Sequence, residues 1–303
     1  MAPLTKPTYL PHDLARASYP ATPTSSRRFR DPVPTGFDAA TFTSAQAVAT
    51  IRRAFLLAKT SHRDWSSYKR EGRFDPRQAA RASRSELDVF RRKTGRSTTR
   101  VRCAVMLDAS GSMNAQDALI ENPLDPAMKL RTNRRVAAAV FGALVAKALG
   151  TVPTIDLDVF QHTVGRSNEV VLKWRWAKGT PVQVFNAATR AVGGSGNADG
   201  HALFAVTERM RKSLKRDERG VIMMVSDGLP ADYSGDGKSN AGQALIDAVA
   251  HARKHGITVI GVAIDGSDQT RYYGKDTITH DGSWSHLGAN LAKVIGAALA
   301  KPR

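Results

Sequence analysis

The sequence predicts an α/β fold built on a doubly wound, mainly parallel sheet. After residue 100, short apolar runs alternate with longer segments in which apolar residues recur at helical spacing. Strands that alternate with helices in this way form parallel sheets with helices on both faces. Polar residues follow two of the apolar runs directly. Because ligands in such folds bind beyond the carboxyl ends of the strands, we expect a binding site at one edge of the sheet.

Nine segments after residue 98 are expected to form these elements. The predicted strands are residues 101–107, 154–160, 169–174, 221–225 and 258–264. The predicted helices are residues 126–149, 200–213, 243–255 and 287–299. We assign residues 99–303 to this one domain.

The first hundred residues are of a different kind. Residues 1–40 contain much Pro, Ser and Thr without a periodic apolar pattern, which predicts a flexible tail. Residues 41–98 are predicted to be a basic helical region. Its first helix begins after Ser44 as N-cap and ends near Ser61, and a second short helix begins at Pro76.

Composition restricts the function classes. Cys103 is the only cysteine, so neither a disulfide framework nor a thiolate zinc cluster is expected. No apolar run predicts a signal peptide or a membrane span, and we expect a soluble, cytoplasmic protein without membrane contact. Residues 1–100 hold 20 Lys and Arg against 8 Asp and Glu, which is +12 of the total +18. This charge favours an acidic protein surface as partner, while nucleic acid ranks lower because few aromatic residues lie between the arginines.

A metal site is predicted where the first strand of the domain ends. Asp108, Ser110 and Ser112 alternate along the chain, so that their oxygens face the same side of an extended loop, and Gly111 permits a sharp turn. Hard oxygen donors with few carboxylates suit Mg²⁺, or Mn²⁺, better than zinc or copper. The alternative is that these are only turn and cap residues, which Asp and Ser also favour.

Two further loops are expected to reach the same edge of the sheet. Asp227 follows the fourth strand and brings a second carboxylate. The glycine-rich segment 193–200 opens a helix and contains Asn197 and Asp199. Either of these two side chains is a candidate for the third-loop ligand. Asp199 is equally well explained as the N-cap of the following helix.

Other chemistries are not supported by the motifs. The glycine-rich segment lacks the Gly-Lys-Ser/Thr ending of a phosphate loop, so ATP is not expected to bind there. Ser110 is preceded by Asp-Ala and does not form a Gly-x-Ser-x-Gly nucleophile elbow. We therefore expect a non-catalytic subunit. Histidines such as His201 and His255 are interpreted as surface residues.

The three loops resemble the metal-ion-dependent adhesion site of von Willebrand factor A domains. That site has the pattern Asp-x-Ser-x-Ser, then a threonine from a second loop, then an aspartate. The middle loop of this chain contains no threonine, so Asn197 or Asp199 must take its place. The resemblance implies a doubly wound sheet of the von Willebrand factor A type.

Further motifs resemble the CobT-type subunit of aerobic cobaltochelatase. They are Trp65 with residues 70–75, and residues 197–203, 222–230 and 268–273, in one order along the chain. The resemblance implies a subunit that couples an AAA+ ATPase ring of the CobS type, and a large chelatase subunit, to cobalt insertion into a corrin in cobalamin biosynthesis. A short or virus-encoded relative, or a generic partner of a MoxR-type AAA+ ATPase, is the alternative. A nucleic-acid-binding accessory protein is the third interpretation.

Overall fold

A computed structural model describes most of the α/β part of the chain. The described residues are 44–60, 65–69, 73–78, 81, 84, 89–93, 100–122, 125, 128–164, 170–177, 181–189, 196–215, 218–228, 230, 241–264 and 266–300. The expected tail, residues 1–40, lies outside them, and the domain boundaries remain predictions.

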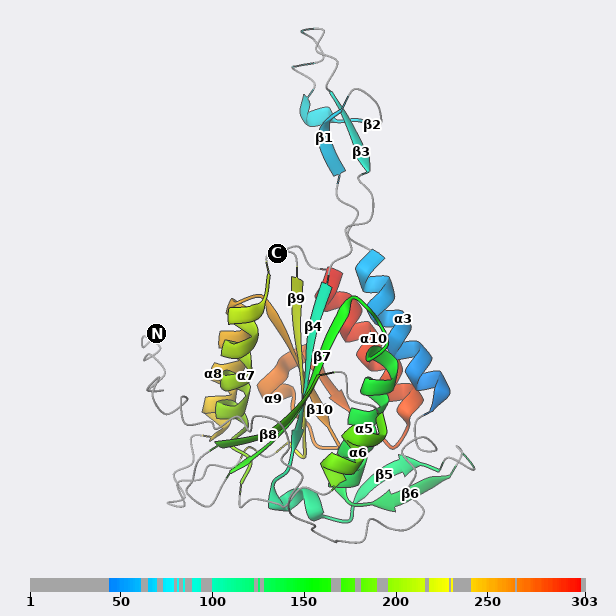
Figure 1. Cartoon of the computed structure of the whole chain (residues 1–303), viewed down its shortest axis with the longest axis vertical. Coiled ribbons are helices and arrows are strands. Elements are labelled where there is room, and N and C mark those ends of the chain that lie inside the picture. Colours follow the sequence, from blue (N-terminus) through cyan, green and yellow to red (C-terminus); the bar gives the residue numbers. More distant parts are fainter. Residues whose placement is uncertain are drawn as a thin grey trace.

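A six-stranded sheet forms the centre of the molecule (Figure 1). Its strands lie in the order β11-β10-β9-β4-β7-β8. Their bounds are β4 Arg100–Asp108, β7 Ile155–Val164, β8 Val170–Ala177, β9 Glu218–Ser226, β10 Ile257–Ala263 and β11 Thr277–Thr279. All neighbours are parallel except β7 and β8. The expected mainly parallel sheet is thus confirmed, with β11 as an unpredicted sixth strand.

The strand order reverses between β4 and β9. From β4 the chain continues outward to β7 and β8, then returns to the other side of β4 and continues through β9, β10 and β11. The carboxyl ends of β4 and β9, which lie next to each other, therefore carry loops that diverge to opposite faces. This is the position at which doubly wound sheets bind their ligands.

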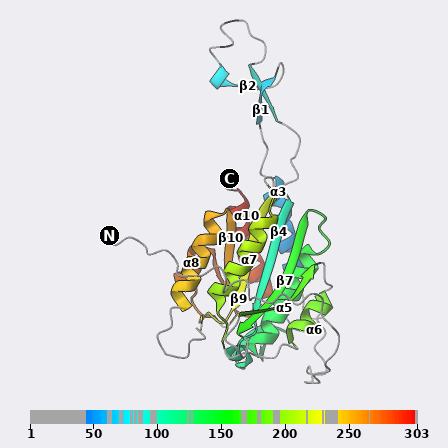
Figure 2. The same cartoon turned by 60° about the vertical axis from the view of Figure 1, so that its left-hand side comes forward.

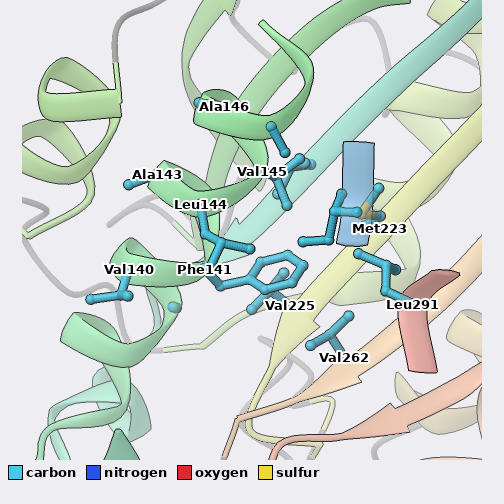
Figure 3. Packing of buried hydrophobic residues seen from close by; sticks show 14 of the residues in the cluster. Val140, Phe141, Ala143, Leu144, Val145, Ala146, Met223, Val225, Val262 and Leu291 are labelled. Atoms are coloured by element: carbon cyan, nitrogen blue, oxygen red, sulfur yellow. The ribbon is translucent and has the colours of Figure 1, made fainter. Parts of the chain in front are cut away.

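Alternate residues of the strands enter two separate hydrophobic cores. Val105 and Leu107 of β4 pack with the helices on one face, α5 Arg134–Leu149, α6 Pro181–Thr189, α10 Trp284–Ala300 and α3 Ala45–Thr60. Ala104 and Met106 pack on the other face with α7 Asp199–Ser213, α8 Ala241–Lys254 and α9 Thr270–Tyr273. Figure 3 shows Phe141 of α5 beside Val225 of β9 in the first core. Burial on both faces fixes the register of every central strand.

The helix expected at residues 126–149 begins later than predicted. It starts at Arg134, because the Asn133 side chain accepts a hydrogen bond from the Val136 backbone N at 2.7 Å and so caps it. The residues before it form an antiparallel hairpin of β5 Ala118–Glu121 and β6 Lys129–Thr132. A short 3-10 helix, η2 Gly111–Asn114, connects β4 to this hairpin.

The predicted basic helical region, residues 41–98, needs two corrections. Its first helix, α3, packs against α10, and Ile51 and Phe55 are part of the first core, so this helix belongs to the α/β body. The second predicted helix begins at Pro76 with a 3-10 turn, η1 Pro76–Gln78, and Arg81 beyond it is helical, while residues 79–80 and 82–83 lie outside the described ones. Around it lies an antiparallel sheet of β1 Trp65–Lys69, β3 Phe90–Lys93 and β2 Arg73–Phe74. Period-2 alternation is hard to recognise in strands as short as these.

One glycine of β10 is required by the packing of α9. A Cβ on Gly261 would lie 2.0 Å from Cδ2 of the buried Tyr273 ring, so only glycine lets this ring reach the sheet. A further 3-10 helix, η3 Gly274–Asp276, then leads into β11. Among the described residues no helix combines the length and apolarity needed to cross a bilayer.

We expect Gly261→Ala to lower the free energy of unfolding by about 2 kcal/mol or more, because an added methyl group must displace an aromatic ring in a packed core. Gly296→Ala on α10 is the matched control, since nothing lies within 4 Å of its added Cβ. Alanine there should stabilise the helix by up to about 1 kcal/mol. Urea unfolding of both variants measures the difference, and equal stabilities would contradict the packing described.

Candidate metal centre

Three loops meet at the carboxyl edge of the sheet where the strand order reverses. Asp108 is the last residue of β4, Asp227 directly follows β9, and Asp199 is the first residue of α7. All three carboxylates are buried, each with 1% of its surface exposed. The predicted convergence of the loops is therefore present in the structure.

The β4 loop directs two hydroxyl groups to one point. The Ser110 backbone N donates to Asp108 Oδ1 at 2.7 Å, which folds the loop back over the carboxylate. The Oγ atoms of Ser110 and Ser112 lie 2.9 Å apart. Ser110 is buried, whereas Gly111 and Ser112 are exposed. This loop therefore forms the side of the site that faces solvent.

The second loop joins two carboxylates through an amide. Asn197 Nδ2 donates to Asp108 Oδ2 at 3.3 Å and to Asp199 Oδ2 at 3.2 Å. Between them Ala198 has a φ of 44°, in the left-handed region that non-glycine residues rarely adopt. Strain of this kind costs on the order of 1 kcal/mol and persists where surrounding contacts fix the backbone. Here it places Asn197 and Asp199 on the same side.

Asp199 is not an N-cap. Ala198 occupies that position, and no side-chain hydrogen bond caps α7. The other oxygen of the Asp199 carboxylate, Oδ1, lies 2.7 Å from Nε2 of the buried His162 on β7. The alternative interpretation of Asp199 as a cap is therefore wrong, and its carboxylate belongs to the cluster around Asp108.

The third loop presents Asp227 with one oxygen unpaired. Arg134 Nη1 donates to Asp227 Oδ2 at 3.0 Å, while the buried Oδ1 has no hydrogen-bond partner. The loop after β10 supports this segment. There Ser267 Oγ donates to the Asp227 carbonyl at 3.0 Å, and Gln269 Nε2 donates to the Ser226 carbonyl at 3.3 Å.

Sequence reasoning missed two members of the site. Arg134, the first residue of α5, contacts Asp227 and also Asp117, whose Oδ1 accepts from its Nε at 2.7 Å. His162 lies opposite Asp108 in the register of β4 and β7. Its position at the end of a buried strand was the available signal, but strand pairing had to be known before it could be used.

Burial and neighbouring charges shift the pKa values of Asp108 and His162. Burial, and after it the charge of Asp199, raises the pKa of Asp108 from 3.8 to about 7, and the charge of Asp227 adds to this effect. Burial alone would lower the pKa of His162, but its hydrogen bond to Asp199 and the charges of Asp199 and Asp108 raise it overall. The cluster thus favours any additional positive charge.

The residues present fit a divalent cation. The donors are the oxygens of Asp108, Ser110, Ser112 and Asp227, with Asp199 or Asn197 behind them, and a hard oxygen set of this kind suits Mg²⁺ or Mn²⁺. The unpaired, buried Oδ1 of Asp227 is the strongest sign, because buried polar atoms normally have a partner. Asn197 turns its amino group toward the carboxylates, so its amide would have to rotate to become a ligand. A bound ion would supply an open coordination position for an external carboxylate.

Comparisons with known proteins give one family match. A family model described as "Protein of unknown function (DUF1194)" matches residues 98–292. No curated protein matches the sequence. The expected fold class, a doubly wound α/β sheet of the von Willebrand factor A type, is confirmed by the strand order and the two helical layers.

Several solved structures match part of this chain at low identity. The pilus adhesin SpaC of Lactobacillus rhamnosus GG is 13% identical over 67% of this chain, with a TM-score of 0.45, and this chain spans only 30% of it. Manganese-loaded TRAP of Plasmodium vivax is 11% identical over 65% of this chain and 73% of its own, with a TM-score of 0.45. The vWF domain of the pilus tip protein Mfa5 of Porphyromonas gingivalis is 12% identical over 66% of this chain and 95% of its own, with a TM-score of 0.43. Similarity at this level concerns the fold alone.

Asp108→Asn tests the buried charge in the metal-free protein. A carboxyl with a raised pKa holds a proton in the folded state that the unfolded chain releases, so stability falls as pH rises from about 4 to about 7. In EDTA at pH 8 we expect Asp108→Asn to be more stable than the parent by about 1 to 3 kcal/mol. In Mg²⁺ the order should reverse, because the amide is a poorer ligand.

Urea unfolding at pH 5 and pH 8, with EDTA and with Mg²⁺, measures these differences. Asp156→Asn is the control, because Asp156 is exposed at the opposite end of the sheet on β7. An Asp108→Asn variant that Mg²⁺ stabilises as much as the parent would show that Asp108 is not a ligand.

Arg134→Met tests whether a cation and the guanidinium compensate the same charge. In EDTA we expect a loss of about 2 to 4 kcal/mol, because Asp227 is left buried without a counter-charge. Mg²⁺ should restore a larger part of the stability than it adds to the parent protein. Thermal unfolding with and without Mg²⁺ checks this, with Arg131→Met as control because Arg131 is exposed and bonds only the Gln116 carbonyl in the contacts described. If Mg²⁺ stabilised the parent and Arg134→Met equally, the cation and the guanidinium would not compensate the same charge.

Proposed function

We propose that this chain, which belongs to the DUF1194 family, is a Mg²⁺-dependent protein-interaction subunit. The observation that supports this most is the cluster of three buried carboxylates with a single unpaired oxygen at a solvent-facing edge of the sheet. The described residues around it offer oxygen ligands and no activated nucleophile. The site is thus suited to hold a cation and present it to another molecule.

The cation would act as a bridge to a carboxylate of the partner. The oxygens of Asp108, Ser110, Ser112 and Asp227 would hold the ion on the protein side. The exposed Gly111 and Ser112 border the open side. An Asp or Glu of the partner can complete the coordination from there. Without the ion, the same carboxylate would face three like charges, and the contact would be repulsive.

An AAA+ ATPase ring is the proposed partner. The resemblance of residues 197–203, 222–230 and 268–273 to the CobT-type subunit supports this. The first two segments contain site carboxylates, Asp199 and Asp227, and Gln269 of the third supports the loop of Asp227. More specifically, we propose a ring of the CobS type that acts with a large chelatase subunit to insert cobalt into a corrin. A MoxR-type ring serving another remodelling or cofactor-maturation task is the alternative.

The test first recovers the AAA+ ATPase from native cell extract with the immobilised chain in Mg²⁺, and then measures the affinity of this chain for the ATPase. The affinity should fall at least about tenfold with EDTA, or with Asp227→Asn, at both low and high salt, because the ion bridge is a direct bond in a partly dry interface. Exposed ion pairs contribute only about 0 to 1 kcal/mol and are screened by salt.

Asp156→Asn again serves as control and should leave the affinity unchanged. Deleting residues 1–40 should mainly slow association at low salt, since that segment would steer the encounter rather than form the bond. Equal affinity with and without divalent cation would contradict the proposed bridge and place the interface elsewhere. Recovery of a corrin-modifying subunit with the ATPase would favour the cobaltochelatase form of the proposal over the MoxR-type form.

A further inference from the structure

A second group of metal-binding side chains lies on α7 and α8, away from the sheet edge. Glu208 of α7, His251 of α8 and His255 just after α8 each offer a ligand atom, and these atoms lie within 4.8 Å of one another. All three residues are partly exposed. Glu208 is nine residues beyond Asp199 on α7, which is about 13 Å along the helix. The group therefore shares no ligand with the carboxylate cluster.

The two helices hold these side chains together. Residues four apart on a helix lie on the same face, so His251 and His255 point to the same side, with ring centroids 4.7 Å apart. Helices α7 and α8 lie side by side (Figures 1 and 2) and approach closely at Gly200, where a Cβ would be 2.6 Å from the Ala244 backbone. This close packing brings Glu208 to the histidines.

The ring of His251 is fixed before any ion binds. It stacks on Phe204 of α7 with centroids 4.6 Å apart, and its Nε2 lies 2.9 Å from Glu208 Oε1. In tetrahedral zinc sites with bonds of about 2.0 to 2.1 Å, the ligand atoms lie roughly 3.3 Å apart. The three ligand atoms here lie within 4.8 Å of one another, so each has to move by only about 1 Å to bind the same ion. Side-chain rotation at a half-exposed surface supplies such shifts without a change of backbone.

The protonation states favour metal binding at neutral pH. The hydrogen bond from Arg211 is the main cause that lowers the pKa of Glu208 to about 2. Burial, followed by the neighbouring His251 and Arg211, lowers the pKa of His255 below its ordinary value. Arg211 competes for this carboxylate, because its Nε donates to Oε1 at 3.0 Å and its Nη2 donates to Oε2 at 2.7 Å. Solvent screens this exposed ion pair, so a metal ion held by two imidazoles can displace the guanidinium.

We propose that Glu208, His251 and His255 form a second metal site, which takes a late first-row transition-metal ion such as Zn²⁺. Two imidazoles and one carboxylate are ligands that suit Zn²⁺, Co²⁺, Ni²⁺ and Cu²⁺, whereas Mg²⁺ prefers oxygen alone. Three protein ligands leave a fourth position open to solvent. The ion links α7, which begins in the carboxylate cluster, to α8.

The test uses the full chain without a histidine tag, in the Asp108→Asn background, so that Zn²⁺ cannot be held by the first site. Calorimetry with Zn²⁺ in the presence of excess Mg²⁺ should show one bound ion per chain. His255→Ala and His251→Ala should each weaken binding at least about tenfold. His286→Ala is the matched control, because this histidine is exposed on α10 and its side chain contacts only Asp281 in the contacts described.

Binding of Co²⁺ tests the same site by an independent measurement. Its visible absorption should show nitrogen coordination in the Asp108→Asn protein and lose it in the His255→Ala variant, while circular dichroism confirms that both are folded. Binding of Zn²⁺ that is unchanged in both histidine variants would overturn the proposal. So would a complete loss of Zn²⁺ binding in the Asp108→Asn protein, because all of the metal would then have been in the carboxylate cluster.

Discussion

The burial of three carboxylates together at the carboxyl edge of the sheet is the constraint on which this structure depends. Asp108, Asp199 and Asp227 come from separate loops, and burial, with the charges of Asp199 and Asp227 added to it, raises the pKa of Asp108 to about 7. Burying like charges together is costly unless a positive charge compensates them. The reversal of strand order between β4 and β9 forces this encounter, because it places two of the loops beside each other.

The surrounding elements compensate the charge only in part. Arg134 contacts Asp227 and His162 contacts Asp199, whereas one oxygen of Asp227 has no partner. Strain at Ala198 shows that the second loop is fixed by its contacts and not by its own preference. A divalent cation would satisfy the remaining charge and link all three loops, which is why a folded, binding-competent edge and a bound ion are expected to depend on each other.

The sequence was informative wherever a short-range pattern decides the structure. Apolar runs predicted five of the six sheet strands, and the spacing of Asp108, Ser110 and Ser112 predicted the first loop of the site. Long-range pairing decided the rest. His162 joins the site only because β7 pairs with β4 in one register, and Arg134 only because Asn133 starts α5 at that point. His255, interpreted as a surface residue, lies near two other ligand atoms because of the packing of α7 on α8.

Crystals of the protein grown with Mn²⁺ would test the central claim most directly, through the anomalous scattering of the ion. The account predicts one peak within about 2.3 Å of Ser110 Oγ, Ser112 Oγ and a carboxylate oxygen of Asp108, with Asp227 reached directly or through a bound water. Its remaining coordination position should face solvent. Crystals saturated with Mn²⁺ that show no peak at this edge, or that show Mn²⁺ held only by other residues, would contradict the assignment of the carboxylate cluster as a cation site.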